Sequence, residues 1–397
     1  MADLAASLDP IPASLSSAEV LQRLVAFDTT SRNSNLDLIG WVRAYLNGLG
    51  VPYRLSFDPT GQKANLHAIV GPQAAGGIAL SGHTDVVPVD GQAWTGDPFR
   101  LRRENGRMFG RGTADMKGFV AACLAAVPTF QAAGLGRPIH LLLSYDEEVS
   151  CDGARRLIGD FGDSGLLPSL CIVGEPSGMQ PIVAHKGRLA VQVTARGRTG
   201  HSSDPGKGVN AVFAAAEAVA WVAAEARRFA SEGPFAPGFD PPHTTVHVGT
   251  LQGGTILNII PDTARFVMEW REIPGSDANA EVERLRAYVA AVLEPAMHAV
   301  DPATGFAFEV LNWLPGVALD PHHELAILVG QLTGSNSVGR VSYGTEAGLF
   351  ERAGIPSIVC GPGHIAQAHQ ADEWIAESEL AACDAFLGRL ASRLAAS

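Results

Sequence analysis

Short apolar segments that end in turn-forming residues recur through the first half of the chain, and they constrain its fold more than any other feature. The clearest are residues 66–70, 78–81, 139–144 and 170–173. Each is typical of a strand buried on both faces of a mostly parallel sheet. Helix-like segments at residues 18–27, 37–49 and 119–127 alternate with these strands, so we expect an α/β fold with helices on both faces.

The pattern changes near residue 187. Residues 189–195, 245–251, 263–270 and 306–312 alternate between apolar and polar side chains, and helix-like segments lie at 209–229 and 278–292. This order of strands and helices is that of a ferredoxin-like α+β module. After Pro315 the first pattern resumes, with segments at 324–332, 355–360 and 377–395. We therefore predict an α/β domain in two parts, 1–186 and 313–397, interrupted by a smaller inserted α+β domain at 187–312.

Composition excludes several classes of function. The 397 residues contain 29 Lys and Arg against 41 Asp and Glu, a net charge of −12, with no basic run of the kind that binds nucleic acid. The long uncharged stretch 118–136 contains Pro128 and polar residues, which favours a buried helix over a membrane span. The N-terminus lacks the pattern of a secretory signal, and the five widely spaced cysteines are typical of reduced thiols. We expect a cytoplasmic protein that binds neither nucleic acid nor membrane.

Histidine and carboxylate side chains follow several of the predicted strands. His83 and Asp85 come directly after residues 78–81, at the carboxyl edge of the sheet where ligand sites of α/β folds gather. Asp85 could hydrogen-bond one ring nitrogen of His83 while the other nitrogen faces a metal. A capped strand end with a satisfied histidine is an equal alternative. In the glycine-rich loop at 110–118, Asp115 is either held rigidly before a helix or serves as an ordinary N-cap.

Three further groups extend this pattern. Glu147 and Glu148 follow the strand at 139–144, where adjacent carboxylates need either a cation or a solvated loop. Glu175 follows the strand at 170–173, although a helix-entry turn would also accept it. His369 follows the strand at 355–360, and His364 competes with it for the same role.

Two histidines and three carboxylates without a cysteine suit two divalent ions, Zn²⁺ most of all, with Co²⁺ or Mn²⁺ as alternatives. Asp115, Glu148 and Glu175 supply three negative charges, and a hydroxide would complete the balance against two divalent cations. Paired ions of this kind polarise a carbonyl and lower the pKa of a water to about 7. Glu147 would remain free to accept the proton of that water and pass it to a leaving amine.

The motifs SGHTDVVP, GRGTADMKG, DEE, VGEPS, HKG, GHSSDP, NIIP, YGTEA and AHQADEW occur along nearly the whole chain. In this set and order the chain resembles the family of dinuclear-zinc deacylases and peptidases, and it is most similar to the acetylornithine deacetylase branch. The resemblance implies that His83 and Glu175 bind one metal, that Glu148 and His369 bind the other, and that Asp115 bridges them before a cis peptide. Glu147 would be the general acid and base, with Asp85 behind His83.

The resemblance also implies roles for the inserted domain, which would be a lid and dimerisation domain of a homodimer. His201 would stabilise the oxyanion, in the site of the partner subunit. The implied substrate contacts are Asn258, Arg271, Gly344 and Thr345, with Lys186 and Arg188 in support. Arg271 could instead form a surface salt bridge. Glu346 would face the ammonium group of the substrate.

The implied activity is hydrolysis of the amide bond of N-acyl amino acids, with N-acetyl-L-ornithine converted to L-ornithine and acetate in arginine biosynthesis. Succinyl-diaminopimelate desuccinylase, a general aminoacylase and a dipeptidase are alternatives within the family. A non-catalytic metal-binding or regulatory protein on the same fold is the alternative from another class, and the free carboxylate of Glu147 argues against it.

Overall fold

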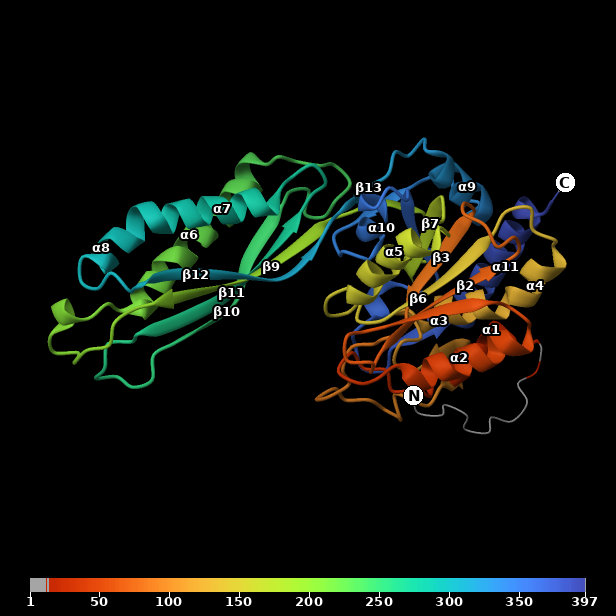
Figure 1. Ribbon diagram of the computed structural model, residues 1–397, viewed down its shortest axis with the longest axis horizontal. Coiled ribbons are helices and arrows are strands. Elements are labelled where there is room, and N and C mark those ends of the chain that lie inside the picture. The colour runs from red at the N-terminus through yellow and green to blue at the C-terminus, as the bar shows by residue number, and fades with distance from the viewer. Residues whose placement is uncertain (1–11, 13, 397) are drawn as a thin grey trace. The chain divides into compact units, whose positions relative to one another are not determined.

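The computed structural model describes residue 12 and residues 14–396, and the contacts within it divide the chain into two units (Figure 1). The first unit holds the described residues up to Ala184, then Val317–Gly339, then the described residues from Thr345 onward. The second unit holds His185–Gly316 and Arg340–Gly344. The first residues of the chain, from which the absence of a secretory signal is predicted, lie outside the described part.

A mixed sheet forms the centre of the first unit. The strands on its main path are β1 (Tyr53–Phe57), β2 (Ala64–Val70), β3 (Ile78–His83), β6 (Ile139–Ser144), β7 (Leu170–Pro176), β8 (Ile182–His185), β13 (Val317–Ala318) and β15 (Ser357–Gly361), and a ninth strand, β14 (Gly339–Val341), also pairs with β8. They lie in the order β1-β2-β6-β3-β7-β15-β8-β13. The central strands β6, β3, β7 and β15 are parallel to one another, and the pairs β1–β2, β2–β6 and β15–β8 are antiparallel. The predicted α/β class with a mostly parallel sheet is confirmed.

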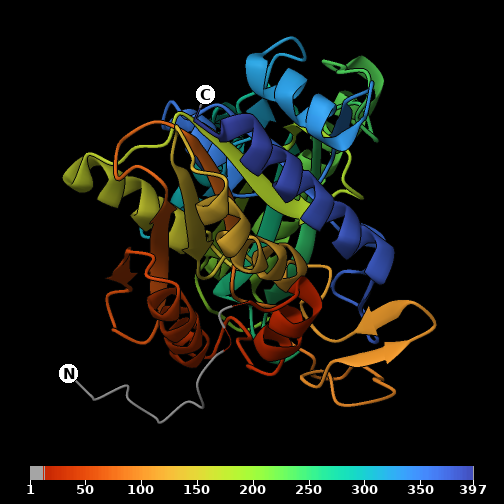
Figure 2. The ribbon, with the colours of Figure 1, turned by 90° about the vertical axis from the view of Figure 1, so that its right-hand side faces the viewer.

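Helices cover both faces of this sheet. They are α1 (Ser17–Val25), α2 (Leu36–Gly48), α3 (Lys117–Ala125), α4 (Val127–Ala132), α5 (Asp152–Ser164), α9 (Glu324–Thr333), α10 (Ala347–Arg352) and α11 (Glu377–Leu394). Because successive side chains of a strand point to opposite faces, the neighbours of two adjacent residues of β3 show which helix covers each face of the sheet. Ser81 faces Glu346 at the start of α10, whereas a Cβ on Gly82 would lie 2.9 Å from Val120 of α3. The dark-blue helix α11 packs against α3 (Figure 2).

Two glycines allow α3 to lie directly on the strands. A Cβ added to Gly174 of β7 would lie 2.0 Å from the Phe119 ring, and the Cβ that Gly82 lacks would also overlap the helix. Contacts that short are impossible for a packed side chain, so this approach requires glycine. As a result Asp115, two residues before α3, lies close to the carboxyl ends of β3 and β7.

A small second sheet in the first unit joins two distant loops. It contains β4 (Arg102–Glu104), β5 (Arg107–Phe109) and β16 (Trp374–Ala376) in the order β16-β5-β4. The antiparallel pairing places Trp374 opposite Phe109. The loop before β16, which contains His369, is thereby held beside the loop that leads to Asp115.

The second unit has a four-stranded antiparallel sheet with helices on one face. Its elements are β9 (Gly187–Arg196), α6 (Ala211–Glu232), β10 (Thr245–Gly253), β11 (Thr263–Glu272), α7 (Ala278–Tyr288), α8 (Glu294–His298) and β12 (Gly305–Leu314), and the strand order is β10-β11-β9-β12. This is the ferredoxin-like arrangement that the alternation predicts. Trp270 of β11 is fully buried and meets the Phe229 ring of α6 edge-on at 5.8 Å.

A short strand, β14 (Gly339–Val341), completes the secondary structure between α9 and α10. Among the described residues, no helix combines the length and the apolar character needed to cross a membrane. All five cysteines are buried and free of disulfide bonds.

Candidate metal centre

His83 is the last residue of β3 and is completely buried. Its Nδ1–H donates to the backbone carbonyl of Asp85 at 2.9 Å. This hydrogen bond leaves Nε2 as the unprotonated nitrogen of the neutral ring, the state that binds a metal. Nε2 lies 3.1 Å from Asp115 Oδ1 and 3.7 Å from Glu175 Oε1.

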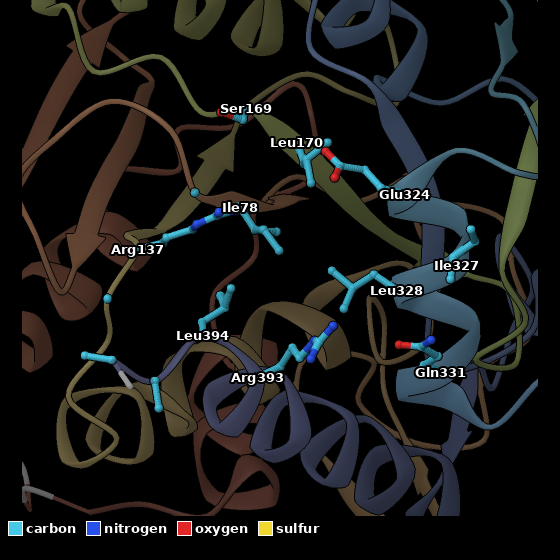
Figure 3. Close-up of a pocket in the computed structure, with 14 residues that line it drawn as sticks. Ile78, Arg137, Ser169, Leu170, Glu324, Ile327, Leu328, Gln331, Arg393 and Leu394 are labelled. Atoms are coloured by element: carbon cyan, nitrogen blue, oxygen red, sulfur yellow. The ribbon is translucent and has the colours of Figure 1, made fainter.

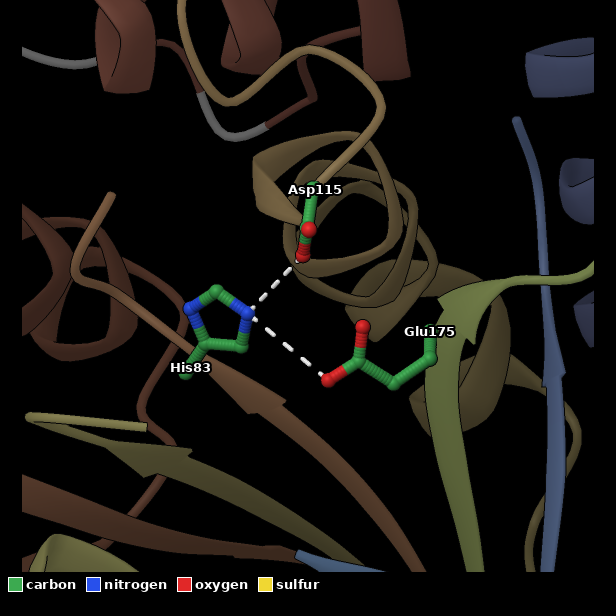
Figure 4. A group of neighbouring side chains, drawn as sticks. All are labelled: His83, Asp115 and Glu175. Carbon is green, nitrogen blue, oxygen red and sulfur yellow. Dashed lines mark hydrogen bonds and ion pairs between the residues drawn. The ribbon is translucent and has the colours of Figure 1, made fainter. Parts of the chain in front are cut away.

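Asp115 lies between two groups of donors. Ligand atoms of His83, Asp115 and Glu175 all lie within 4.8 Å of one another, and Figure 4 shows the His83 ring pointing at both carboxylates. Atoms of Asp115, Glu148 and His369 form a second group within the same limit. Asp115 is common to both groups, because Oδ1 faces His83 while Oδ2 lies 3.3 Å from His369 Nε2. The peptide after Asp115 is cis, as the resemblance implies.

Glu148 and His369 complete the second group. Glu148 Oε2 lies 3.1 Å from His369 Nε2, and Glu148 Oε1 is buried without a hydrogen-bond partner in the described structure. His369 is half exposed, so this side of the centre is the open one. The competing His364 instead pairs with Glu379 at 2.7 Å and belongs to neither group.

Asp85 bonds one ring nitrogen of His83, as the sequence predicts, but it does so through its backbone carbonyl and its carboxylate has other partners. Asp85 Oδ1 lies 3.5 Å from His83 Nδ1, beyond a good hydrogen bond, and the ring donates to the Asp85 carbonyl instead. The carboxylate accepts the backbone N–H groups of Glu147 at 3.0 Å and Glu148 at 3.3 Å, and the Ser31 hydroxyl at 2.7 Å. Asp85 therefore joins the end of β3 to the turn that carries Glu147 and Glu148.

Glu147 stands beside the two groups and belongs to neither of them. The thiol of Cys151, for which the sequence suggests no role, lies 3.6 Å from Glu147 Oε1. Burial raises the pKa of Glu147 well above its usual range, and Glu148 and Asp115 add to the rise. A carboxyl in this position can hold a proton near neutral pH.

The pKa values of the other donors show that, without a cation, the buried negative charges of the centre are poorly compensated. Burial and Asp115 raise the pKa of Glu148 to about 7 and raise that of Glu175 well above its usual range. Hydrogen bonds to Asp115 and Glu148 raise the pKa of His369 to about 10. Burial would raise the pKa of Asp115 too, but its bonds to His369 and His83 lower it.

This donor set fits two divalent cations. Crowded buried carboxylates are costly in free energy unless a cation compensates their charge. Oε1 of Glu148 has no hydrogen-bond partner among the described residues, as expected for an oxygen that binds a metal ion. Imidazole nitrogen and carboxylate oxygen are the donors that Zn²⁺ accepts in catalytic sites. His83 and Glu175 would hold one ion, Glu148 and His369 would hold the other, and Asp115 would be shared.

Glu346 does not meet the expectation that it faces a substrate ammonium. It is fully buried, and its two oxygens accept the hydroxyls of Ser81 at 2.5 Å and Ser144 at 2.8 Å. Because both oxygens are already engaged between β3 and β6, Glu346 is a structural link beneath the strand ends. The adjacent Thr345 is also buried, and its hydroxyl oxygen accepts the N–H of Ala347 at 3.1 Å.

The other predicted residues lie in the second unit. Arg271 Nε pairs with Glu269 at 2.7 Å, so the surface salt bridge that the sequence leaves open is present. Arg188 pairs with the other oxygen of Glu269 at 2.6 Å. Lys186 Nζ donates to the carbonyls of Pro241 and His243 at 2.8 and 2.7 Å.

His201 and Asn258 occupy neighbouring exposed loops of that unit. The Asn258 carbonyl accepts the N–H of Ser202 at 3.2 Å. The N–H and hydroxyl of Ser203 both reach His201 Nδ1, at 3.2 and 2.7 Å. Nδ1 is therefore an acceptor, and the neutral ring carries its proton on Nε2. Gly344 packs so closely that a Cβ would lie 3.3 Å from the Lys186 carbonyl.

A cavity of about 650 Å³ lies at the opposite end of the central strands (Figure 3). Its lining includes Ile78 and Leu170, the first residues of β3 and β7, together with Arg137 and Arg393. No metal donor identified above lines it. This cavity is therefore separate from the candidate centre.

Comparison with known proteins gives consistent matches over most of the chain. Peptidase family M20/M25/M40 matches residues 79–393. An acetylornithine deacetylase from Myxococcus xanthus is 36% identical over 375 residues, covering 93% of this chain and 95% of that protein.

Solved structures share the fold at low sequence identity. A tripeptidase from Staphylococcus aureus superposes with a TM-score of 0.73 at 18% identity, covering 98% of this chain and 100% of that one. A dinuclear metal-binding peptidase of the M20 family from Bacillus subtilis gives a TM-score of 0.65 at 15% identity, covering 96% and 98%.

Proposed function

Because the chain belongs to peptidase family M20/M25/M40 and is an amide-bond hydrolase, we propose that it removes the acyl group from N-acyl amino acids. The substrate we propose is N-acetyl-L-ornithine, with L-ornithine and acetate as products in arginine biosynthesis. The observation that supports hydrolysis is the pair of donor groups that share Asp115, with the carboxyl of Glu147 alongside. The similarity to the Myxococcus xanthus protein supports the choice of substrate.

The metal centre is proposed to hold two Zn²⁺ ions, with Co²⁺ or Mn²⁺ as possible replacements. When bound, such ions would polarise the scissile carbonyl and lower the pKa of a water to about 7, so that hydroxide is available to attack near neutral pH. The protein orients His83 through the Asp85 carbonyl, so that the neutral ring presents Nε2 to a metal. Asp115 joins the two donor groups because each of its carboxylate oxygens faces a different histidine.

Glu147 is proposed to be the general acid and base. Its backbone is held by Asp85, while its carboxyl lies beside both donor groups. From there it would accept a proton from water and deliver it to the leaving amine. Asp85 is proposed to support this step by fixing the turn that contains Glu147.

The second unit is proposed to be a lid and dimerisation domain that contributes substrate contacts. The proton on His201 Nε2 suits donation to a developing oxyanion, and we propose that it acts in the site of the partner subunit. Asn258, Arg271, Gly344 and Lys186 of this unit, with Thr345 of the first unit, are proposed to help bind the substrate carboxylate. The terminal nitrogens of Arg271 make no hydrogen bond within the described residues, which supports this assignment.

We propose that the enzyme is a cytoplasmic homodimer. Several large apolar side chains of the second unit are exposed, among them Leu257 at 97%, Phe213 at 68% and Ile256 at 59%. Exposed apolar side chains of this kind are typical of interaction surfaces. Light scattering over a range of concentrations would test the proposal, and a monomer at micromolar concentration would contradict it.

The enzymatic proposal is tested by removing metal with a chelator and restoring it with Zn²⁺ or Co²⁺. Specificity constants are then compared for N-acetyl-L-ornithine, N-succinyl-diaminopimelate, other N-acetyl amino acids and dipeptides. We expect metal-dependent hydrolysis with N-acetyl-L-ornithine as the best substrate. A better rate with one of the others would reassign the substrate, and no hydrolysis of any of them would favour a metal-binding protein without activity.

The role of Glu147 is tested with Glu147→Gln. We expect this variant to bind two metal ions and to lose most of its turnover, because the proton acceptor is gone. Asp152→Asn, which changes an exposed acid five residues later, is the matched control and should retain activity. Loss of a metal ion from Glu147→Gln would instead make Glu147 a ligand.

A further inference from the structure

Glu373 is a buried carboxylate that the proposed mechanism does not use. It lies four residues after His369 and only 1% of it is exposed. Its Oε1 accepts the N–H groups of Ala114 and Asp115 at 2.9 and 3.1 Å. Its Oε2 accepts the N–H of Gly112 at 3.0 Å and Arg111 Nη1 at 2.8 Å. One side chain from the His369 loop therefore binds the backbone that carries Asp115.

The same hydrogen-bond network also reaches the backbone of His369, through Arg111 and Gln92. The Arg111 guanidinium, itself 1% exposed, donates through Nη2 to the side chain of Gln92. Gln92 Nε2 donates to the backbone carbonyl of His369 at 2.9 Å. His369 has a φ of 61°, a left-handed conformation that a non-glycine residue keeps only when its surroundings hold it.

We propose that Glu373, through Arg111 and Gln92, is a positioning residue that sets the separation between Asp115 and His369. These two residues are donors of the same group, the one completed by Glu148. The proposal rests on the two-metal centre proposed above. The other group shares only Asp115 with this network, because His83 and Glu175 are held by strands of the central sheet.

The hydrogen-bond chemistry predicts what happens when the carboxylate is replaced by an amide. A glutamine at position 373 has one acceptor oxygen and one NH₂ group. In either orientation its NH₂ group would face two donors, either Ala114 and Asp115 or Gly112 and Arg111. The loop before α3 would then shift relative to His369, and the group containing Glu148 would lose affinity for its ion.

The test is a calorimetric titration of the metal-free, full-length protein with Zn²⁺. We expect the wild-type protein to bind two ions. We expect Glu373→Gln to bind one ion nearly as well as the wild type and the other about 10–100-fold more weakly, the usual effect of losing a residue that orients metal ligands. Gln92→Ala, a partly exposed change that leaves Arg111 and Glu373 paired, should weaken the same ion by about 2–10-fold, the effect of one hydrogen bond.

Glu379→Gln is the matched control. Glu379 also accepts a backbone N–H and a side-chain nitrogen, from Gly363 at 2.9 Å and His364 at 2.7 Å, but it touches no metal donor. It should lose some stability and keep both Zn²⁺ affinities. Melting of the metal-free variants identifies any that fail to fold, and Gln92→Ala then carries the test.

Separate outcomes contradict the two proposals. A wild-type protein that binds fewer than two Zn²⁺ ions contradicts the metal centre itself. If the wild type binds two ions and Gln92→Ala and Glu373→Gln bind both equally well, the positioning role is wrong. Equal weakening of both ions in folded Glu373→Gln would also overturn it, because that result indicates a general structural role.

Discussion

Two buried histidines should make the first unit lose stability in mild acid. His67 of β2 and His140 of β6 lie across a strand pair, with His67 Nε2 2.9 Å from His140 Nδ1. His140 Nε2 is bonded to the carbonyl of Gly76 at 2.8 Å, so it must carry a proton. The neutral His140 ring then has a bare Nδ1, which accepts the Nε2–H of His67. The pair is satisfied when both rings are uncharged.

Burial lowers the pKa of His67 from 6.5 to about 3, and the charges of His140 and Arg54 act in the same direction. The unfolded chain keeps a pKa near 6.5, so between pH 6.5 and about 3 it binds a proton that the folded protein does not. Stability is therefore complete above pH 6.5 and falls as the pH decreases. At pH 5 the loss from His67 alone is about 2 kcal/mol, at about 1.4 kcal/mol per pH unit.

The prediction is tested with His67→Gln, whose amide can still donate to His140 Nδ1 but cannot titrate. Urea unfolding of metal-free protein is measured at pH 6.5 and 5.0 by hydrogen exchange of peptides from β2 and β6, which reports on the first unit alone. The stability difference between the two pH values should be about 2 kcal/mol smaller in the variant. His322→Gln, at an exposed histidine, should behave like the wild type. An equal pH dependence in His67→Gln and wild type would refute the reasoning.

Three further predictions concern packing and the site. Gly174→Ala should lower the free energy of unfolding by about 1–3 kcal/mol and weaken Zn²⁺ binding, because its Cβ would overlap the Phe119 ring. The double variant with Phe119→Leu should recover part of the stability, measured by urea unfolding, and part of the Zn²⁺ affinity, measured by calorimetry. Asp85→Asn should lower kcat about 10–100-fold in an amide-hydrolysis assay, since its amide cannot accept both backbone N–H groups that the carboxylate binds; unchanged kcat would contradict this. Trp270→Ala should destabilise the second unit by about 3–5 kcal/mol, measured by urea unfolding of that unit, and a cost below 1 kcal/mol would contradict its place in the core.

Much of the fold is predictable from the chain because its signals are local. The apolar segments before His83 and Glu175 form β3 and β7, and the alternation around Trp270 forms β11. The helix α5 (Asp152–Ser164) is not among the elements that the sequence analysis identifies. Its apolar residues are few, and Cys151 before it has a φ of 55°, so neither an apolar run nor a standard cap marks its start.

Histidine and carboxylates after successive strands predict that these side chains gather at one edge of the sheet, because parallel strands bring their carboxyl ends together. The structure does bring His83, Asp115 and Glu175 into one group and Asp115, Glu148 and His369 into another. The partners of those donors were not predictable in the same way. Asp85 binds the backbone of Glu147, 62 residues away, and Glu373 binds that of Asp115, 258 residues away. No periodic pattern in the sequence predicts either of these two hydrogen-bonded pairs.

The sequence by itself determined the α/β and ferredoxin-like elements and the residue types that gather at the strand ends, since both follow from short-range patterns of polarity. The tertiary structure decided how each carboxylate is used. Asp115 faces two histidines, Glu147 remains outside both donor groups, and Glu346 is enclosed between two hydroxyls beneath the sheet edge. These outcomes depend on which buried donors surround each oxygen, and that is settled only when distant segments pack together.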